Sequence, residues 1–450
     1  MKDNAYYTEV AVIGAGISGA SLLFMLSRYS NVESIAVFEK YDTAATLNSS
    51  AKANSQTLHI GDIETNYDLA KATKVKASSS MVANFIHHFN YEDELGFRKT
   101  KMVLAVGEEE IVQLKERHET FKTLFPYLEL WDEKKLKEIE PNLLEGRKEP
   151  IVALGVKDRI TTVDFGALSR TFIALSEKEE TSISLHFNTE VTHISKKWDK
   201  FVLHTEQGEF MARSIVVNAG AHSLMIAHEM GYGDDYAMLP IGGSFYFSEK
   251  ELLNAKVYTM QNPKLPFAAI HGDPDLTAEW KTRFGPTAFA MPKLERYHMM
   301  DVSELFEMLD LDPSVLGVYY DLMSDDDIRH YIIRNFAHEL PGIGNEFFIK
   351  EVQKIIPALN ADDIKYAEGY GGMRPQIIDK KKKTLLLGEA KIDTGEGIIF
   401  NMTPSPGASS CLGNAFEDAK IICSFLGADL QRNKIKEELC DEKEYCYINK

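Results

Sequence analysis

The stretch Thr8 to Lys40 reads TEVAVIGAGISGASLLFMLSRYSNVESIAVFEK and holds the parts of a nucleotide-binding βαβ unit in one short run. The apolar segment from Val10 to Ile13 predicts a strand. Ala20 to Leu26 has helical spacing and is rich in strong helix formers. The run IAVFE then predicts a second strand that ends in an acid. This order of strand, turn, helix and strand predicts a parallel sheet that begins with the first residues of the chain.

Three glycines join the first strand to the helix. Gly14, Gly16 and Gly19 give G-x-G-x-x-G, which provides a tight turn, a close approach to pyrophosphate at a helix N-terminus, and close helix–strand packing. Glu39, about twenty residues beyond Gly19, is placed to accept a hydrogen bond from a ribose 2′-hydroxyl. The pattern predicts a dinucleotide with an unphosphorylated adenosine ribose. A glycine-rich turn in an ordinary α/β protein is the alternative.

Length and composition limit the classes of protein. A chain of 450 residues predicts two domains, and a net charge of −18 argues against nucleic acid and against broad attraction to anionic lipid. The sequence has no long apolar run and no signal-peptide pattern, which predicts a cytoplasmic protein with at most peripheral membrane contact. The four cysteines come late and form no C-x-x-C, so we expect reduced thiols and no metal centre.

The nucleotide-binding unit is followed by a loop of small polar residues, 43–57, which suits a segment lying against a cofactor. Its candidate cofactor contacts are Ser49, Ser50, Asn54 and Thr57, together with Lys40 before the loop. Residues 185–195, 200–206 and 209–221 predict a three-stranded β-meander that ends in VVNAGA. We expect its last strand to return to the nucleotide sheet, with Val191, Ala219 and Gly220 at the cofactor. A buried parallel strand with a glycine exit explains VVNAGA equally well.

The remaining pattern predicts a second, strand-rich region. Strands are expected in GGSFYF, PFAAIH and TRFGPTAFAM between residues 240 and 292, and near 101–106, 364–378, 384–387 and 397–401. Helices are expected at 66–89, 108–125, 131–141, 165–177, 302–309, 325–340, 346–355 and 412–426, with Asp132 and Asp164 as N-caps.

Because the nucleotide fold is interrupted twice, an FAD protein is favoured over an NAD protein. We expect an FAD-binding domain from 1–70, 150–225 and 360–430, a substrate domain from 71–149 and 226–359, and a tail from 431–450.

At this point several ordered motifs resemble the FAD-dependent 2-hydroxyacid dehydrogenases of the D-amino-acid-oxidase-like superfamily, and most of all the malate:quinone oxidoreductases. They are N-x-x-T-x-H from Asn54 with E-x-N-Y after it, VDFGALSR from Val163, PIGGSF from Pro240, FGPTA from Phe284, RPQII from Arg374 and SPGASS from Ser405. The resemblance implies an α/β fold with a discontinuous Rossmann-type FAD domain and a second, α+β domain on a mostly antiparallel sheet. It implies oxidation of L-malate to oxaloacetate, with electrons passed to a membrane quinone at the inner face of the cytoplasmic membrane.

Oxidation of a 2-hydroxy acid needs a base for the hydroxyl proton, a hydride acceptor, and cations for the carboxylates. His271, at the end of the PFAAIH strand, is the candidate base, and a histidine that merely bonds to backbone is the alternative. His59 is the rival, matching the family's flavin-loop histidine. Arg374 in RPQII is the candidate carboxylate clamp, because its planar fork matches a carboxylate. A second cation is expected at Lys293 or Arg283, with Arg98 and Lys74 as further candidates.

Two late segments complete the expected site. The turn SPGASS precedes a helix, so Gly407, Ala408 and Ser409 are expected to present backbone N–H groups to the flavin. The lysine run 380–383 predicts a solvated hairpin turn, and the alternative is contact with lipid headgroups. Two other functions fit the same residues: an oxygen-using oxidase of L-2-hydroxyglutarate or another 2-hydroxy acid, and a flavin-binding scaffold without turnover.

Overall fold

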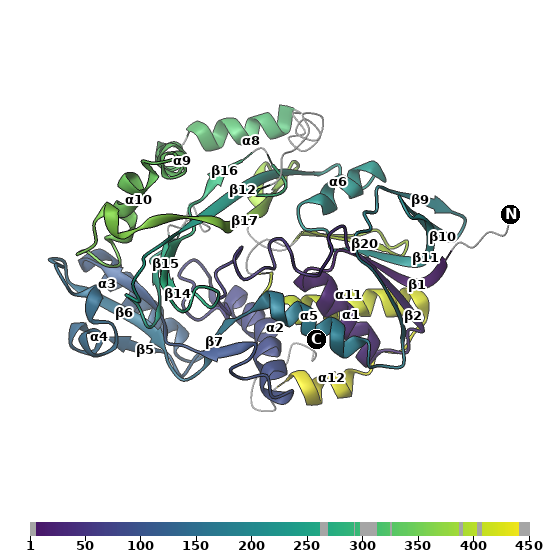
Figure 1. Ribbon diagram of the computed structural model, residues 1–450, viewed down its shortest axis with the longest axis horizontal. Coiled ribbons are helices and arrows are strands. Elements are labelled where there is room, and N and C mark those ends of the chain that lie inside the picture. The colour runs from purple at the N-terminus through teal and green to yellow at the C-terminus, as the bar shows by residue number, and fades with distance from the viewer. Residues whose placement is uncertain are drawn as a thin grey trace.

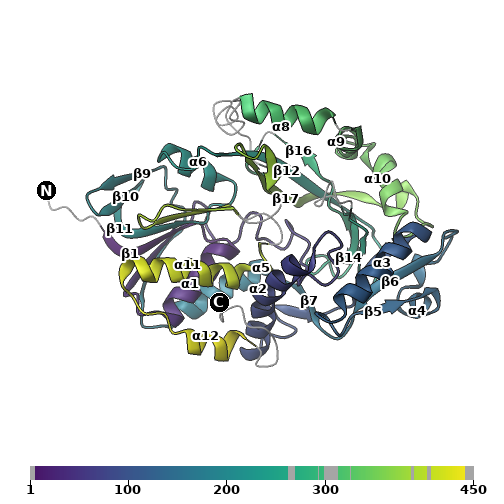
Figure 2. The same ribbon diagram turned by 180° about the vertical axis from the view of Figure 1, so that it is seen from behind.

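The computed structural model describes residues 6–261, 269–291, 293–297, 313–324, 326–386, 390–402 and 407–440. In these residues two large sheets lie side by side, each with its own helices (Figures 1 and 2). The first, of eight strands, has the path β19-β20-β11-β1-β2-β8, with β10 and β9 added beside β11. Its strands are β1 (Tyr6–Ile13), β2 (Ser34–Phe38), β8 (Ser182–His186), β9 (His193–Lys197), β10 (Lys200–Thr205), β11 (Gly208–Val217), β19 (Ala390–Asp393) and β20 (Ile398–Met402).

The centre of the first sheet is parallel. β1 pairs in parallel with β2 and with β11, and β11 pairs in parallel with β20. Apolar side chains on one face of this sheet form a core with helices α1 (Ile17–Tyr29), α2 (Leu69–His88), α5 (Phe165–Ser176), α11 (Cys411–Leu426) and α12 (Arg432–Leu439). Within that core Phe24 stacks on Phe172, with ring centroids 5.1 Å apart. The predicted Rossmann-type sheet is therefore confirmed, including the return of the VVNAGA strand beside β1.

The second sheet is mostly antiparallel, as expected, and has the path β18-β17-β12-β15-β14-β13-β4-β6-β5, with β16 beside β12. Its strands are β4 (Lys101–Val106), β5 (Glu129–Trp131), β6 (Ile151–Val156), β12 (Tyr236–Phe247), β13 (Lys256–Thr259), β14 (His271–Pro274), β15 (Thr282–Gly285), β16 (Phe289–Ala290), β17 (Lys365–Asp379) and β18 (Thr384–Leu386). Two short strands, β3 (Gly96–Arg98) and β7 (Ile160–Val163), pair separately. The remaining helices are α3 (Glu108–Phe121), α4 (Glu133–Ile139), α6 (His222–Glu229), α8 (Pro313–Ser324), α9 (Asp326–His338) and α10 (Gly344–Val352).

Several local predictions are confirmed by this structure. The Asp132 and Asp164 carboxylates accept hydrogen bonds from Lys135 N and Ala167 N and so cap α4 and α5. The lysine run 380–383 is the turn between β17 and β18, where Lys381 pairs with Asp235. These features depend on neighbours in sequence, which is why the pattern of residues predicts them well.

Other predictions need correction. Residues 185–195 are not one strand: β8 pairs in parallel with β2, whereas β9 pairs with β10. β6 and β17 belong to the second sheet, so the expected domain boundaries at 150 and 360 move to positions after β6 and after β18. α8 and β19 were not expected, and the helix expected at 302–309 lies outside the described residues. Alternation of apolar residues identifies a strand but does not identify the sheet that it joins.

The described part of the chain contains no helix long and apolar enough to span a bilayer. No group of three or more metal-binding side chains was found among these residues. Cys411 and Cys423 are free and buried, in line with the expected thiols, but Cys440 is disulfide-bonded, which contradicts that expectation for this residue.

Candidate active site

Two cavities meet where β1 and β11 end. The first is lined by the predicted cofactor residues Gly14, Gly16, Glu39, Lys40, Ser49, Val191, Ala219 and Gly220. The second is lined by Gly16, Ser49, Asn54, Thr57, Gly220, Gly407, Ala408 and Ser409. The cavities have Gly16, Asn48, Ser49, Asn218 and Gly220 in common. They therefore form one continuous trough from the acid at the end of β2 to the N-terminus of α11.

The glycine turn at the junction is closely packed. Gly14 has φ +99°, and a Cβ there would lie 2.5 Å from Asn218 O. A Cβ on Gly19 would lie 1.9 Å from Gly14 O, so this glycine lets α1 approach the strand and does not itself line either cavity. Glu39 accepts hydrogen bonds from Ala15 N at 2.8 Å and Tyr41 N at 3.1 Å. Its carboxylate is thus fixed beside the turn, at the end of the first cavity.

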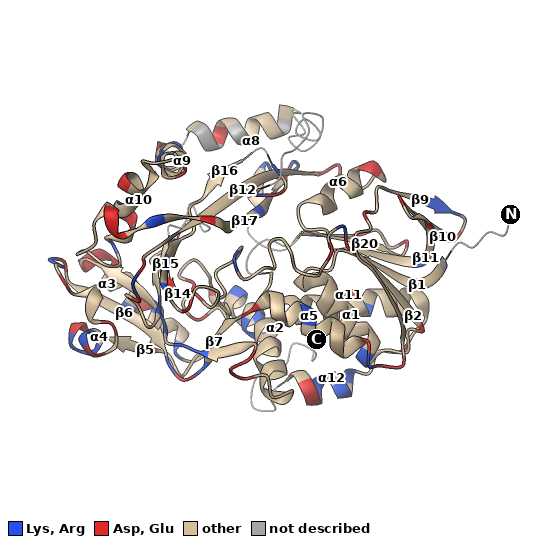
Figure 3. Ribbon diagram, in the orientation of Figure 1, with Lys and Arg blue, Asp and Glu red and all other residues tan. Residues whose placement is uncertain are grey.

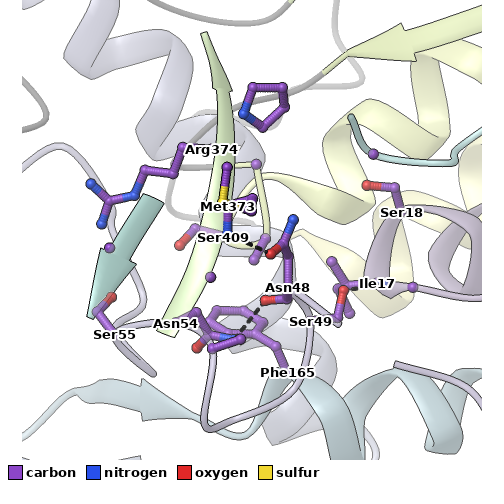
Figure 4. Close-up of a pocket in the computed structure, with 18 of the residues that line it drawn as sticks. Ile17, Ser18, Asn48, Ser49, Asn54, Ser55, Phe165, Met373, Arg374 and Ser409 are labelled. Atoms are coloured by element: carbon purple, nitrogen blue, oxygen red, sulfur yellow. Dashed lines mark hydrogen bonds between the residues drawn. The ribbon is translucent and has the colours of Figure 1, made fainter. Parts of the chain in front are cut away.

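The loop 43–57 is held against β17 of the second sheet. Asn48 Oδ1 accepts a hydrogen bond from Met373 N at 2.9 Å, as Figure 4 shows. Asn54 Nδ2 donates to Asn48 O at 3.1 Å and to Ser50 O at 2.8 Å. Ser50 closes the loop from within and lines neither cavity. Ser49 Oγ instead accepts from Ile17 N at 2.9 Å, at the start of α1.

His59 lines the second cavity and is held in one orientation. Its Nδ1 lies 2.6 Å from Glu64 Oε1, and its backbone N donates to Ser409 Oγ at 2.9 Å. Burial alone would raise the pKa of Glu64, but the hydrogen bond from His59 and the charge of Lys101 lower that pKa to about 2. An ionised carboxylate can only accept, so in this hydrogen bond Nδ1 of His59 carries the hydrogen. Nε2 lies 3.5 Å from Ser55 Oγ, on the cavity wall.

Arg374 lines the same cavity from β17. In Figure 4 its guanidinium extends toward Ser55, on the side away from the N-terminus of α1. Burial lowers the pKa of Arg374, yet an arginine remains protonated in proteins. The structure therefore brings the His59 imidazole and the half-buried Arg374 guanidinium to one cavity.

His271 lies elsewhere. It opens β14 rather than ending a strand, is 2% exposed, and does not line either cavity. Its Nδ1 bonds to Asp273 Oδ1, and Tyr258, whose ring centroid is 4.6 Å from that of His271, also contacts His59. Burial lowers the pKa of His271 to about 4. The predicted strand PFAAIH lies partly outside the described residues, and His271 itself is buried in the second sheet.

The buried charges around His271 also contact the loop 43–57. Arg283 pairs with Asp273 at 3.1 Å and with Asp275 at 2.7 Å, and all three are fully buried. Burial alone would raise the pKa of Asp273, but the charges of Lys256 and Arg283 lower it. Lys256 Nζ donates to Ser55 O at 3.0 Å. Arg283 is thus committed to ion pairs within the protein, and it lines neither cavity.

The other expected cations also lie away from the cavities. Lys293 does not line them. Arg98 pairs with Glu92 at 3.0 Å on the surface, and Lys74 is exposed on α2. Lys40 lines the first cavity but pairs with Glu295.

Sequence reasoning missed Glu64, Asn48 and Asn218. Glu64 was visible as the acid of E-x-N-Y, five residues after His59, but nothing in that spacing shows that the chain turns back to bring the two side chains together. Asn218 was visible within VVNAGA, and its Nδ2 is buried without a hydrogen-bond partner in the described structure.

Comparisons with solved structures agree with this fold. L-alpha-glycerophosphate oxidase from Mycoplasma pneumoniae, a structure with FAD bound, superposes with a TM-score of 0.64 at 17% identity, covering 92% of this chain and 94% of the other. Glycine oxidase from Geobacillus kaustophilus gives a TM-score of 0.63 at 16% identity, covering 93% and 95%. At these identities the likeness concerns the fold alone.

Sequence comparisons are more specific. A probable malate:quinone oxidoreductase of Campylobacter jejuni is 52% identical, covering 96% of this chain and 98% of the relative. A malate:quinone oxidoreductase of Helicobacter pylori is 43% identical, covering 97% and 98%. The family model described as malate:quinone oxidoreductase (Mqo) matches residues 6–417. With the site geometry, these matches establish that the chain belongs to the malate:quinone oxidoreductase family.

Proposed function

We propose that this chain binds FAD along the joined cavities and oxidises L-malate to oxaloacetate with His59 as the base, passing the electrons to a membrane quinone. The cofactor fits the residues present. Glu39 lies at one end of the trough for the adenosine ribose, and the glycine turn at the start of α1 suits a pyrophosphate. The buried, unpartnered Asn218 Nδ2 lies at the junction and offers a donor. Gly407 to Ser409 would border the flavin end.

The single observation that carries the proposal is that His59, which is paired with Glu64, lines the same cavity as Arg374. When bound, FAD supplies the acceptor for the hydride from C2 of malate. His59 Nε2 takes the proton of the C2 hydroxyl, and ionised Glu64 stabilises the resulting imidazolium and keeps the ring in place. The bond between C2 and oxygen thereby becomes a carbonyl.

Arg374 supplies the second part of the site. Its side chain is half-buried, its guanidinium is cationic, and it lines the same cavity as His59. A bidentate pair with one malate carboxylate would orient C2 and its hydroxyl toward His59 Nε2. His271 is a weaker candidate for the base, because it is buried behind the wall and its lowered pKa makes it a poor proton acceptor.

The proposal is tested by anaerobic titration of the purified, FAD-loaded protein with L-malate, D-malate, lactate and L-2-hydroxyglutarate, following flavin absorbance. L-malate alone should bleach the flavin fully. Hydrogen peroxide formed in air at the rate of substrate turnover would instead indicate an oxidase, and bound FAD that none of these acids reduces would indicate a scaffold.

Variants test the residue assignment. His59→Gln should keep its FAD and bleach about a thousandfold more slowly, because a general base is lost. His271→Gln should bleach within about tenfold of the unmodified protein. If His271→Gln bleached more slowly than His59→Gln, His271 would be the base instead.

Arg374→Lys keeps the charge but removes the planar fork. It should raise KM for malate about ten- to a hundredfold at unchanged FAD content, as steady-state kinetics with a water-soluble acceptor would measure. An unchanged KM would remove Arg374 from the substrate site.

A further inference from the structure

The side chain of Gln56 joins the loop 43–57 to the second sheet. Gln56 is fully buried, and its Nε2 donates to Ala51 O at 3.0 Å, within the loop, and to Asp275 Oδ2 at 3.1 Å, just after β14. Its Oε1 accepts a hydrogen bond from Leu276 N at 3.0 Å. The amide thus uses both of its hydrogens and its oxygen, and two of its three contacts cross from the loop to the segment that follows β14.

The backbone of Gln56 is held in an unusual conformation. Its φ is +54°, in the left-handed region that residues with a Cβ seldom adopt. Its N donates to Asn54 Oδ1 at 2.9 Å, and its O accepts from Val163 N at 2.8 Å. Such a conformation persists where several surrounding contacts fix it together. Here the contacts come from the loop itself, from β7 and from the segment after β14.

Asp275 belongs to a buried group of charges around β13, β14 and β15. Arg283 Nη1 lies 2.7 Å from Asp275 Oδ2, the same oxygen that accepts from Gln56. Arg283 and Lys256 both pair with Asp273, at 3.1 Å and 3.3 Å. Asp273 of β14 lies opposite Arg283 of β15, and in Figure 3 acidic and basic positions lie close together around these strands. Two buried cations thus balance two buried carboxylates, and breaking such a pair is strongly unfavourable.

The same charges reach the wall of the second cavity from behind. Lys256 Nζ donates to Ser55 O at 3.0 Å, next to Gln56 in the loop. The Arg283 guanidinium lies over the ring of Phe245, 4.2 Å from its centroid. Ser55 and Phe245 both line the second cavity. The ion pairs and the amide of Gln56 therefore hold neighbouring parts of one wall.

The residues that follow Gln56 lead directly to the proposed base. Thr57 Oγ1 accepts from the Tyr258 hydroxyl at 2.7 Å, and Thr57 O accepts from Ser409 Oγ at 3.3 Å. The same Ser409 hydroxyl oxygen accepts from His59 N at 2.9 Å. The position of His59 therefore depends on how the loop is held at Gln56 and Thr57.

We propose that Gln56 is a positioning residue, which ties the loop to the ion pairs of the second sheet through Asp275 and so fixes the wall of the second cavity and His59. The inference rests on the proposed function, because that wall is the one proposed to hold FAD and malate. Gln56 itself lines neither cavity. The position requires an amide, since this group donates to a carboxylate and accepts from a backbone N–H at the same time.

Gln56→Met tests the tie in the full-length, FAD-loaded protein. Methionine has a similar length but offers no strong donor or acceptor, so Asp275 and Leu276 N each lose a partner. We expect kcat/KM for malate to fall about tenfold or more. The dissociation constant of FAD, measured by the rise in flavin fluorescence on dilution of the loaded protein, should rise about threefold or more. The matched control Gln353→Met removes one hydrogen bond to Leu359 O after α10 and should leave both quantities within about twofold.

Gln56→Glu makes the same tie depend on pH. A protonated carboxyl at this position can donate to Asp275 and accept from Leu276 N, whereas an ionised one repels Asp275 and adds a third acid to the two that Lys256 and Arg283 balance. Burial beside a carboxylate raises the pKa of the introduced group above its ordinary value. The activity of this variant relative to the unmodified protein should therefore be about tenfold higher at pH 6 than at pH 8.

Two comparisons show that this pH dependence belongs to the tie. The ratio to the unmodified protein cancels the titration of His59, which both proteins share. For Gln56→Met and for the control Gln353→Glu the ratio should be the same at pH 6 and pH 8. A residue that only stabilised the fold would give Gln56→Glu a constant ratio as well.

FAD binding separates this inference from the proposed function, because it is measured without substrate. The dissociation constant of FAD from Gln56→Glu should also be larger at pH 8 than at pH 6. If malate reduces no form of the protein, the proposed function fails and the FAD constants alone judge Gln56.

Two results would overturn the inference. One is a Gln56→Met protein that binds FAD and oxidises malate within about twofold of the unmodified protein. The other is a Gln56→Glu protein whose activity ratio and FAD constant are the same at both pH values. If Gln56→Met does not fold, Gln56→Glu decides alone, because a single sample is measured with the tie formed and with it broken.

Discussion

At the scale of single residues, the pairing of His59 with Glu64 governs the chemistry that we expect. The carboxylate is ionised because the hydrogen bond from His59 and the charge of Lys101 outweigh its burial, so that its pKa is about 2. Across the physiological range it therefore stays an acceptor for Nδ1–H and a counter-charge for an imidazolium. The second histidine, His271, also faces an aspartate, but it lies outside the cavity.

Glu64→Gln tests this pairing as a positioning effect. The amide keeps the shape but loses the charge, so we expect kcat for malate to fall about a hundredfold while FAD content stays the same. The acidic limb of the kcat/KM profile should move to lower pH, because an imidazolium next to a neutral amide loses its proton more easily. If activity fell equally at every pH and the acidic limb of the profile did not move, Glu64 would have a purely structural role. Glu64→Asp is the conservative comparison and should restore part of kcat.

At the scale of elements, the helix that follows β7 is fixed by a local signal. Asp164 accepts a hydrogen bond from Ala167 N at 2.8 Å at the start of α5, and α5 packs against α1 beneath the first sheet. Phe165, the first residue of α5, lines the second cavity. The cap therefore links a local sequence motif to the wall of the second cavity.

Asp164→Ala should lower the free energy of unfolding by about 1 kcal/mol, because the N–H group of Ala167 loses its partner. Urea denaturation followed by circular dichroism measures this change. Asp164→Asn retains the acceptor and should cost only a few tenths of a kcal/mol, about the same as a neutral surface change. Equal losses in the two variants would mean that the charge, rather than the hydrogen bond, stabilises α5.

At the scale of the whole molecule, buried neutral histidines make stability depend on pH. Burial lowers the pKa of both His271 and His338 to about 4. Neither ring nitrogen of His338 has a hydrogen-bond partner in the described residues. The unfolded chain binds a proton at each histidine near pH ~6.5, whereas the folded chain does not. The stabilisation that each neutral histidine gives the folded protein is therefore complete above pH ~6.5. It is lost as the pH falls toward the pKa that the histidine has in the folded protein.

We expect the free energy of unfolding to drop by roughly 2 kcal/mol for each of these imidazoles between pH 7 and pH 5. Urea midpoints at the two pH values measure the drop. His338→Leu removes one titrating group. The free energy of unfolding of this variant should therefore drop less between the two pH values than that of the unmodified protein. An identical drop in the variant would exclude His338 as a source of the pH dependence.

The two sheets show which features of the fold can be predicted from local sequence. β1, α1 and β2, the caps at Asp132 and Asp164, and the turn at 380–383 were all predicted, because each depends on residues close in the chain. Two features were not predicted: the division of residues 185–195 between β8 and β9, and the placement of β6 and β17 in the second sheet. Strand membership depends on partners more than a hundred residues away, as in the pairing of Ile241 with Arg374.

The sequence by itself determined the nucleotide-binding unit, the order of the motifs, the residue types available for catalysis and a resemblance that named the family. Only the tertiary structure decided which of those residues meet. It placed His59 and Arg374 on one cavity with Glu64 hydrogen-bonded to His59, and it buried His271 and Arg283 in a network of ion pairs. The physical reason is that burial, charge pairing and access to a cavity are set by contacts between distant segments, and these contacts leave no local pattern.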